Sequence, residues 1–278
     1  MKAGLVGRGI TLSRSPAMHE AEGKAQGVDL CYRLFDLDDP EFAQSALADI
    51  VEMAERQGYA GLNITFPFKI DAMSLTHALS RNAETVGAVN TIVFRDGRRY
   101  GHNTDLWGFA EGFRTGMPGA DLSEVLLVGA GGAGYAVAHA LLELGVGTLW
   151  LFDIEESRAE TLAGSLVGTF GHSRVEQAET LSRLPPGLTG IVNATPVGMS
   201  KLPGSPVPRQ CLHAGLWVAD IVYFPLETQL LSDARAAGCP VLSGSGMAVF
   251  QAVRAFELFT GRAPNPDRMK RTFESLDD

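Results

Sequence analysis

Two polar stretches of the sequence each end in an ionisable residue. GLNITFPFK ends in Lys69, and GHNTD ends in Asp105. A lysine and an aspartate that share a site can hold a proton between them, and burial and the partner both change the pKa of the lysine. Such a pair could take the hydroxyl proton while an alcohol is oxidised. Taken alone, the pattern fits two unrelated surface residues equally well, because most lysines are solvated.

A glycine-rich segment, VGAGGAG, follows an apolar run and opens a helical pattern. Gly129, Gly131 and Gly134 fit G-x-G-x-x-G, in which the glycines allow a tight turn, close approach of a pyrophosphate, and packing of helix on strand. The free N–H groups of the helix start would then face the phosphates. A purely structural turn is the alternative in a chain with 32 glycines, but the flanking strand and helix favour a dinucleotide site.

An acidic residue follows the second apolar run of this unit. Asp153 comes about 20 positions after Gly134, where a carboxylate can hydrogen-bond the ribose 2′-hydroxyl of a dinucleotide. It would repel a 2′-phosphate, and Glu155 and Glu156 add further negative charge. We therefore expect NAD rather than NADP, with Arg158 as the one residue that could favour a phosphate.

Composition limits the class of protein. The chain of 278 residues is 45% hydrophobic and 20% charged, as in globular proteins with one large or two ordinary domains. A net charge of -9 disfavours binding to nucleic acid or anionic membranes. No apolar run reaches the roughly 20 residues of a membrane span, and a signal peptide is not apparent, so we expect a cytoplasmic protein. Three scattered cysteines fit reduced thiols, and the spacing of histidines and cysteines predicts no metal site.

Short apolar runs alternate with amphipathic segments, which is typical of an α/β protein. Two helices are predicted early in the chain, over 15–27 with Ser15 as cap and over 40–58. A hairpin is predicted over 88–105 with its turn at Asp96 and Gly97. Further expected elements are strands at 2–7, 31–38, 61–65, 190–195 and 216–222, a strand-helix-strand unit at 124–153, and a helix over 246–261.

These motifs together resemble the shikimate dehydrogenase family over essentially the whole chain. The matching stretches are LSRSPAMH, GLNITFPFK, GAVNTI, GHNTDLWGF, VGAGGAG, NATPVGM, VADIVYFPLETQLL and GSGMAVFQAVRAFELFTG. The resemblance implies an α/β fold with two domains and a substrate cleft between them. Residues 1–105, completed by helices within 241–278, would form the substrate domain, and residues 106–240 the Rossmann NAD-binding domain.

The resemblance also implies roles for individual residues. Lys69 and Asp105 would form a catalytic dyad, while Ser13 and Ser15 would hold the substrate carboxylate with Tyr223 nearby. Ring hydroxyls would be bound by Asn63, Thr65, Asn90 and Gln251. The cofactor would contact the glycine turn, the NATPVGM loop and later positions, namely Gly129, Ala130, Gly131, Gly132, Ala133, Gly134, Asp153, Arg158, Asn193, Thr195, Pro196, Val222, Gly244 and Met247.

The predicted activity is therefore NAD-dependent hydride transfer at a ring secondary alcohol of shikimate or quinate, by a monomer or homodimer. Family members that use NADP typically carry Asn-Arg-Thr where this chain has Asp153, Ile154 and Glu155, so NADP is the less expected cofactor. This departure resembles the NAD-using quinate/shikimate branch. The alternatives are a dehydrogenase for aminoshikimate or another small hydroxy acid, and an inactive homologue that binds a metabolite.

Overall fold

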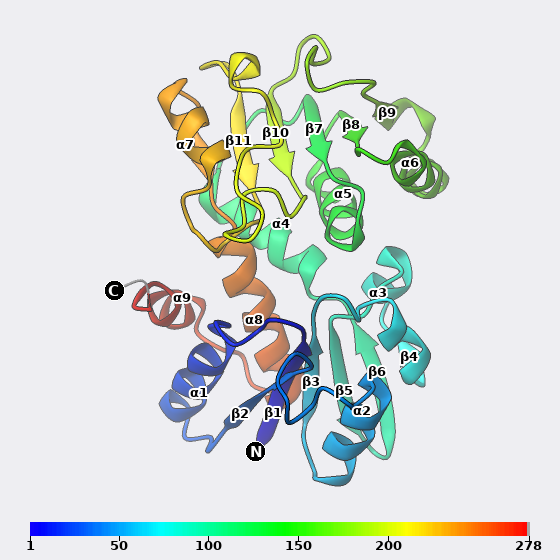
Figure 1. The fold of residues 1–278 in the computed structure, drawn as a ribbon, viewed down its shortest axis with the longest axis vertical. Coiled ribbons are helices and arrows are strands. Elements are labelled where there is room, and N and C mark those ends of the chain that lie inside the picture. The colour runs from blue at the N-terminus through cyan, green and yellow to red at the C-terminus, as the bar shows by residue number, and fades with distance from the viewer. Residues whose placement is uncertain (277–278) are drawn as a thin grey trace. The chain divides into compact units, whose positions relative to one another are not determined.

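The computed structural model describes residues 1–276 and has the predicted α/β fold (Figure 1). Two compact units are present, one made of Met1–Gly108 with the described residues from Val249 onward, the other of Phe109–Ala248. The chain passes between them inside α4 (Asp105–Gly116) and inside α8 (Ser245–Thr260). Within residues 1–276, no helix is both long and apolar enough to cross a membrane.

The first unit contains a mixed sheet with the strand order β2-β1-β3-β5-β6-β4. β1 is parallel to β2 and β3, whereas β5 is antiparallel to both β3 and β6. Its strands are β1 (Lys2–Gly7), β2 (Cys31–Asp36), β3 (Gly61–Ile64), β4 (Ala78–Leu79), β5 (Thr91–Arg95) and β6 (Arg98–His102). Besides parts of α4 and α8, its helices are α1 (Ser15–Ala25), α2 (Leu47–Arg56), η1 (Asp71–Leu75), α3 (Arg81–Val86) and α9 (Pro266–Glu274).

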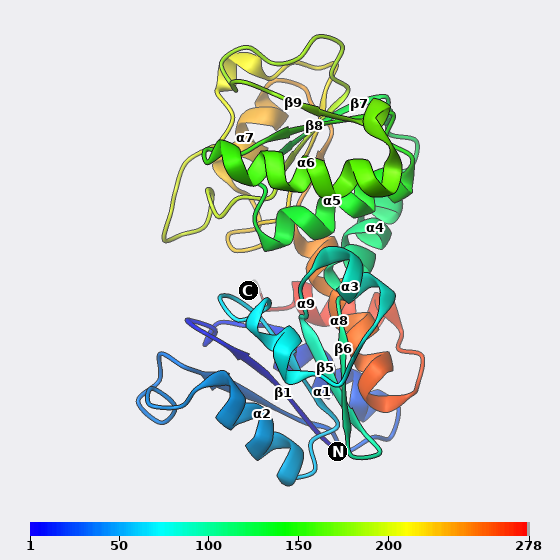
Figure 2. The ribbon, with the colours of Figure 1, turned by 90° about the vertical axis from the view of Figure 1, so that its right-hand side faces the viewer.

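Helices cover both faces of this sheet (Figure 2). α2 packs Ile50 and Val51 into a cluster with Phe35 and Leu62 on one face, because alternate residues of a strand point to the same side. On the other face α1 and α8 contribute aromatic contacts, and the His19 ring of α1 stacks on Tyr32 of β2 at 4.6 Å. The strands are therefore held firmly up to their carboxyl ends, where the polar motifs begin.

The second unit contains a parallel sheet with the order β12-β11-β10-β7-β8-β9. This is the doubly wound order of dinucleotide-binding folds, in which ligands bind at the carboxyl ends of the strands beside the switch between β7 and β10. α5 and α6 lie on one face and α7 on the other (Figure 2). The elements are β7 (Glu124–Val128), α5 (Gly132–Leu144), β8 (Thr148–Phe152), α6 (Glu156–Phe170), η2 (His172–Arg174), β9 (Val175–Gln177), β10 (Gly190–Asn193), η3 (Arg209–Cys211), β11 (Trp217–Asp220), α7 (Gln229–Ala236) and β12 (Val241–Leu242).

The predicted hairpin turn is confirmed, one predicted helix start is wrong, and the cap of another predicted helix is wrong. Asp96 and Gly97 have φ angles of 52° and 68°, as a two-residue hairpin turn requires. The helix predicted over 40–58 begins only at Leu47, because the Asp49 carboxylate accepts a hydrogen bond from the Ala46 N–H and caps the helix there. The residues before it form turns.

Ser15 is the first residue of α1 and not its cap. Arg14 occupies the cap position without a capping side-chain hydrogen bond, and the Ser13 hydroxyl accepts from the Ser15 N–H at 3.3 Å. The serine that helps to satisfy the helix start is therefore Ser13, which lies one residue before the N-cap position.

Two glycine-to-alanine substitutions test the packing of the second unit, because they should change the free energy of unfolding in opposite directions. A Cβ at Gly190 would lie 2.0 Å from the Trp217 ring, so Gly190→Ala should lower the free energy of unfolding by about 1–3 kcal/mol. Gly164 is exposed on α6 with nothing within 4 Å of an added Cβ, so Gly164→Ala should raise it by about 0.5–1 kcal/mol. Urea unfolding followed by circular dichroism measures both. Equal midpoints for the two variants would contradict the close contact at Trp217.

Candidate functional site

Lys69 and Asp105 are in direct contact. The Lys69 Nζ donates a hydrogen bond to Asp105 Oδ2 at 2.6 Å, and Asp105 is only 1% exposed. The second carboxylate oxygen, Oδ1, is also buried and has no hydrogen-bond partner among residues 1–276. Buried polar atoms without a partner are rare, and each needs an explanation. Oδ1 is therefore an acceptor suited to a donor that the chain itself does not provide.

Local structure fixes the position of both side chains. Lys69 lies in the turn after β3, and its carbonyl accepts from the Val89 N–H at 2.8 Å. Asp105 begins α4, where the Asn103 side chain accepts from the Asp105 and Leu106 N–H groups at 3.1 and 3.3 Å. Asn103 also donates to the Ala88 carbonyl at 3.1 Å. A carboxylate in the first turn of a helix interacts favourably with the helix dipole, which suits Asp105 to this position.

A chain of side-chain hydrogen bonds crosses the sheet beside this pair. The Tyr32 hydroxyl donates to Asn63 Oδ1 at 2.7 Å, and Asn63 Nδ2 donates to Thr91 Oγ1 at 2.9 Å. Thr91 Oγ1 donates to Asn90 Oδ1 at 3.1 Å, and Asn90 Nδ2 donates to Thr104 Oγ1 at 3.0 Å. Because the residue after Thr104 is the aspartate of the pair, this chain holds the buried carboxylate in place.

Tyr32, which was not among the predicted site residues, joins this chain to Ser15 of α1. Burial raises the pKa of the Tyr32 hydroxyl, while a hydrogen bond with Ser15 opposes the rise, so Tyr32 keeps its proton at neutral pH. Ser13 and Ser15 are half-buried at the start of α1. Thr65, after β3, is also half-buried.

Two further predicted substrate residues lie elsewhere. Gln251 is half-buried on α8, in the same unit as the Lys69–Asp105 pair. Tyr223 belongs to the second unit, follows β11, and is 37% exposed.

In the glycine turn, some glycines are required by close packing of the backbone and one is not. Gly129 has φ +106°, and a Cβ on it would lie 2.9 Å from the Ala194 carbonyl carbon. A Cβ on Gly134 would lie 2.1 Å from the Gly129 carbonyl oxygen, so the fold itself requires both glycines. Gly131 precedes α5, has an extended backbone, and has nothing within 4 Å of an added Cβ. The fold does not require a glycine there, which fits a place where a phosphate approaches the backbone.

The residue after β8 is bound to this turn. Asp153 Oδ2 accepts from the Ala130 N–H at 2.7 Å, and Oδ1 accepts from the Glu155 N–H at 2.9 Å. Arg158 forms an exposed ion pair with Glu155 at 2.7 Å. Gly132 and Ala133 begin α5 just after the turn.

The NATPVGM loop is organised from within by Asn193. This residue is fully buried, and its Oδ1 accepts from the N–H and hydroxyl of Thr195 at 2.9 and 2.7 Å. Its Nδ2 donates to the Val197 carbonyl at 3.0 Å. Thr195 and Val197 are half-buried, and Pro196 and Met199 are exposed. These residues, and not the Asn193 side chain, form the accessible part of the loop.

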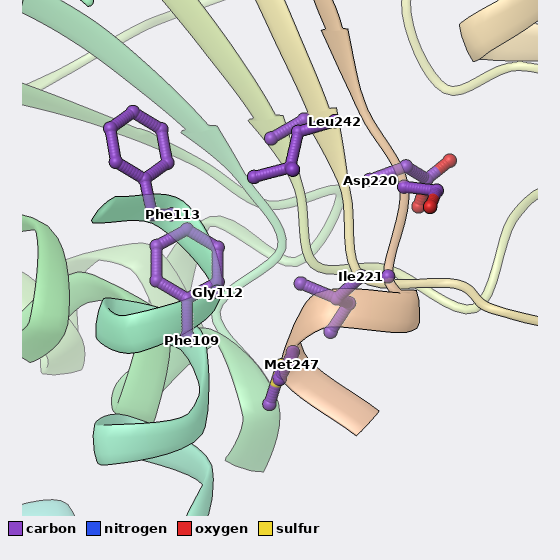
Figure 3. Close-up of a pocket in the computed structure, with 10 residues that line it drawn as sticks. Phe109, Gly112, Phe113, Asp220, Ile221, Leu242 and Met247 are labelled. Atoms are coloured by element: carbon purple, nitrogen blue, oxygen red, sulfur yellow. The ribbon is translucent and has the colours of Figure 1, made fainter. Parts of the chain in front are cut away.

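A small cavity of about 10 Å³ lies at the ends of β11 and β12 (Figure 3). Gly244 and Met247 line it together with Asp220 and Ile221, and Val222 is buried just beyond β11. The space is about that of one water molecule. In Figure 3 the carboxylate of Asp220 points away from the aromatic rings of Phe109 and Phe113. Asp220 was not among the predicted site residues.

Metal ligands are the remaining question about the site chemistry. Over the described part of the chain, no group of three or more His, Cys, Asp or Glu side chains is placed to hold a metal ion.

Comparison with known proteins identifies related sequences and folds. The family model described as the shikimate dehydrogenase substrate binding domain matches residues 5–92, and the one described as the shikimate 5'-dehydrogenase C-terminal domain matches residues 244–272.

Full-length relatives extend these matches. A shikimate dehydrogenase (NADP(+)) of Streptomyces avermitilis is 52% identical over 96% of this chain and 92% of its own length. A quinate/shikimate dehydrogenase (NAD(+)) of Corynebacterium efficiens is 46% identical over 98% of this chain and 97% of its own. The solved structure of quinate dehydrogenase from Corynebacterium glutamicum in complex with NAD has a TM-score of 0.94 at 44% identity, covering 99% of both chains. Since identity at this level extends over nearly the whole sequence and fold, this chain belongs to the shikimate dehydrogenase family.

Proposed function

We propose that this protein oxidises a ring secondary alcohol of quinate or shikimate, giving 3-dehydroquinate or 3-dehydroshikimate, and catalyses the reverse reductions, with NAD as its preferred cofactor. The observation that carries the proposal is the Lys69–Asp105 contact, with one buried carboxylate oxygen that lacks a partner among the described residues. Family membership supplies the reaction class, because the relatives compared above are named as shikimate or quinate dehydrogenases.

The proton of the alcohol is the part of this reaction that the protein must handle. When bound, a nicotinamide cofactor accepts the hydride from the carbon. The hydroxyl proton passes to the neutral amine of Lys69, and the resulting ammonium is held by Asp105 Oδ2. In the reductive direction the ammonium returns this proton to the carbonyl oxygen. Asp105 Oδ1 accepts a hydrogen bond from the substrate, which satisfies the buried atom.

A polyhydroxylated acid needs many matched partners, because its donors and acceptors lose water on binding. Ser13 and Ser15, at the start of α1, present hydroxyls and a positive helix end to the carboxylate. The ring hydroxyls bind to the side chains of Thr65, Gln251 and Asn90. The Asn90 amide can donate to a hydroxyl because only one of its two N–H donors is paired among residues 1–276. Asn63 supports this set through its bonds to Tyr32 and Thr91.

Dinucleotide binding is assigned to the turn after β7. Open space at Gly131 and the start of α5 suit a pyrophosphate, while Asp153 after β8 suits a ribose hydroxyl. The preference for NAD is supported by negative charge, because a 2′-phosphate would meet Asp153 and Glu155. Arg158, the nearby cation, is paired with Glu155 and is therefore less available to a 2′-phosphate. A relative named for NADP(+) is 52% identical, so family membership alone does not decide between the two cofactors.

Steady-state oxidation of quinate and shikimate, each with NAD and with NADP, tests the activity. We expect reduced nicotinamide to form with NAD and at least one of the acids, and kcat/KM to be higher with NAD than with NADP. A folded protein that binds NAD but turns over neither acid would contradict the proposed substrates and favour an amino analogue or another hydroxy acid. A protein that binds neither cofactor would contradict the dehydrogenase itself.

Lys69→Met removes the proposed proton acceptor and keeps the length of the side chain. The turnover number should fall by about 10²–10⁴, the usual contribution of a general acid-base group, with little change in the dissociation constant of NAD. Lys24→Met, on the exposed surface near the end of α1, is the matched control and should keep parental turnover. Turnover within twofold of the parent in Lys69→Met would rule out the proposed role.

Asp153→Asn removes the negative charge but leaves an oxygen that can accept from the Ala130 N–H. The ratio of kcat/KM with NAD to that with NADP should fall about tenfold, because the 2′-phosphate no longer meets this carboxylate. Glu156→Gln removes a neighbouring exposed charge on α6 and should change the ratio much less. An unchanged ratio in Asp153→Asn would place cofactor selection elsewhere.

A further inference from the structure

Asp220 is a buried carboxylate held by neutral partners. It is 2% exposed, and its Oδ1 accepts from Asn193 Nδ2 and from the Val222 N–H, both at 2.9 Å. Its Oδ2 accepts from the Thr228 hydroxyl at 2.7 Å. Within residues 1–276, none of the hydrogen-bond partners of Asp220 is charged, and Asp220 forms no ion pair. Burying a charge without a counter-ion is costly, so a role in function is a reasonable explanation for this residue.

These hydrogen bonds join two loops at the carboxyl edge of the parallel sheet. Asn193 and Asp220 are paired at the ends of β10 and β11, so their side chains meet where the strands stop. Asn193 holds the NATPVGM loop from within, and Thr228 caps α7 by accepting from the Leu231 N–H at 3.3 Å. Asp220 therefore fixes the loop after β10 to the segment between β11 and α7.

We propose that Asp220 is a positioning residue for the dinucleotide, because it fixes the Asn193 loop and Val222 at the end of the sheet where the nicotinamide half of the cofactor binds. This inference rests on the proposed dinucleotide-dependent function. Asp220 does not itself touch the cofactor, since its carboxylate is enclosed by Asn193, Val222 and Thr228. It acts through Thr195 and Pro196, two accessible residues of the loop next to Asn193.

Protonation of Asp220 should change this positioning, because the carboxylate now accepts three hydrogen bonds. Burial raises the pKa of Asp220 to about 6, and the hydrogen bonds from Thr228, Val222 and Asn193 oppose the rise. Above pH 6 the carboxylate accepts from all three groups. Below pH 6 it gains a proton, becomes a donor at one oxygen, and holds its neighbours less well. Affinity for the dinucleotide should therefore weaken as the pH falls through about 6.

The stability of the fold responds to this proton in the opposite direction. The pKa of Asp220 in the folded protein is raised above its ordinary value of 3.8, so the folded state binds the proton more tightly than the unfolded chain. The contribution of Asp220 to stability therefore increases as the pH falls from about 6 toward 4. Weaker dinucleotide binding in this range is not explained by unfolding linked to this group.

Titration calorimetry with NAD⁺ on the full-length protein, between pH 5.5 and 7.5, tests the proposal. Asp220→Asn should bind NAD⁺ about tenfold more weakly than the parent at pH 7.5, as expected for losing one hydrogen bond to a charged group. Its affinity should then be nearly independent of pH, while the parent weakens toward pH 5.5. Asp233→Asn, with a carboxylate on α7 that accepts from Gln229, is the control and should follow the parent at every pH.

A second pair of variants separates positioning from folding. Thr228→Ser keeps the hydroxyl that donates to Asp220 and should bind NAD⁺ like the parent, whereas Thr228→Val should weaken binding in the manner of Asp220→Asn. Parental affinity and pH dependence in both Asp220→Asn and Thr228→Val would overturn the positioning role while leaving the proposed function intact. A parent protein that binds neither NAD⁺ nor NADP⁺ would overturn the proposed function, and the inference with it.

Discussion

A carboxylate that is taken out of water must find hydrogen-bond donors, and this requirement determines where much of the structure lies. Asp36, at the end of β2, accepts from the N–H groups of Gly9 and Ile10 at 2.9 and 2.8 Å and so shapes the loop that leads to α1. Glu22, fully buried on α1, accepts from Arg268 of α9 at 2.6 and 2.9 Å. These two residues fix both ends of the segment that carries the polar start of α1.

The carboxylates proposed to serve the reaction meet the same requirement in different ways. Both oxygens of Asp220 accept hydrogen bonds from neutral donors in two loops, so its interactions are complete within the protein. One oxygen of Asp105 accepts from Lys69, and the other is buried without a partner among residues 1–276. The first arrangement maintains geometry, whereas the second leaves an interaction for a ligand to complete. Comparing satisfied and unsatisfied buried oxygens thus separates a supporting group from a reacting one without reference to motifs.

Local rules predicted the elements whose cause is local. The Asp96–Gly97 turn needs only the backbone freedom of its own residues, and the glycine turn after β7 is recognisable from its spacing. The start of α2 was misplaced because the Asp49 cap competed with an apolar pattern that continued before it. Lys69 and Asp105 could be chosen from polar motif ends. Tyr32 and Asp220 could not, because their bonds to Asn63 and Asn193 join segments distant in sequence, which neither spacing nor composition reveals.

The two-residue turn of the hairpin also determines the position of the Asp105 carboxylate, although the turn lies outside the site. It sets β5 against β6 so that Thr91 lies opposite His102, and this register brings the next residues, Asn103 and Thr104, to Ala88 and Asn90. A slip of one residue would turn the side chains of β6 to the opposite face of the sheet. One extra residue in this exposed turn would therefore disable the site without replacing any residue within it.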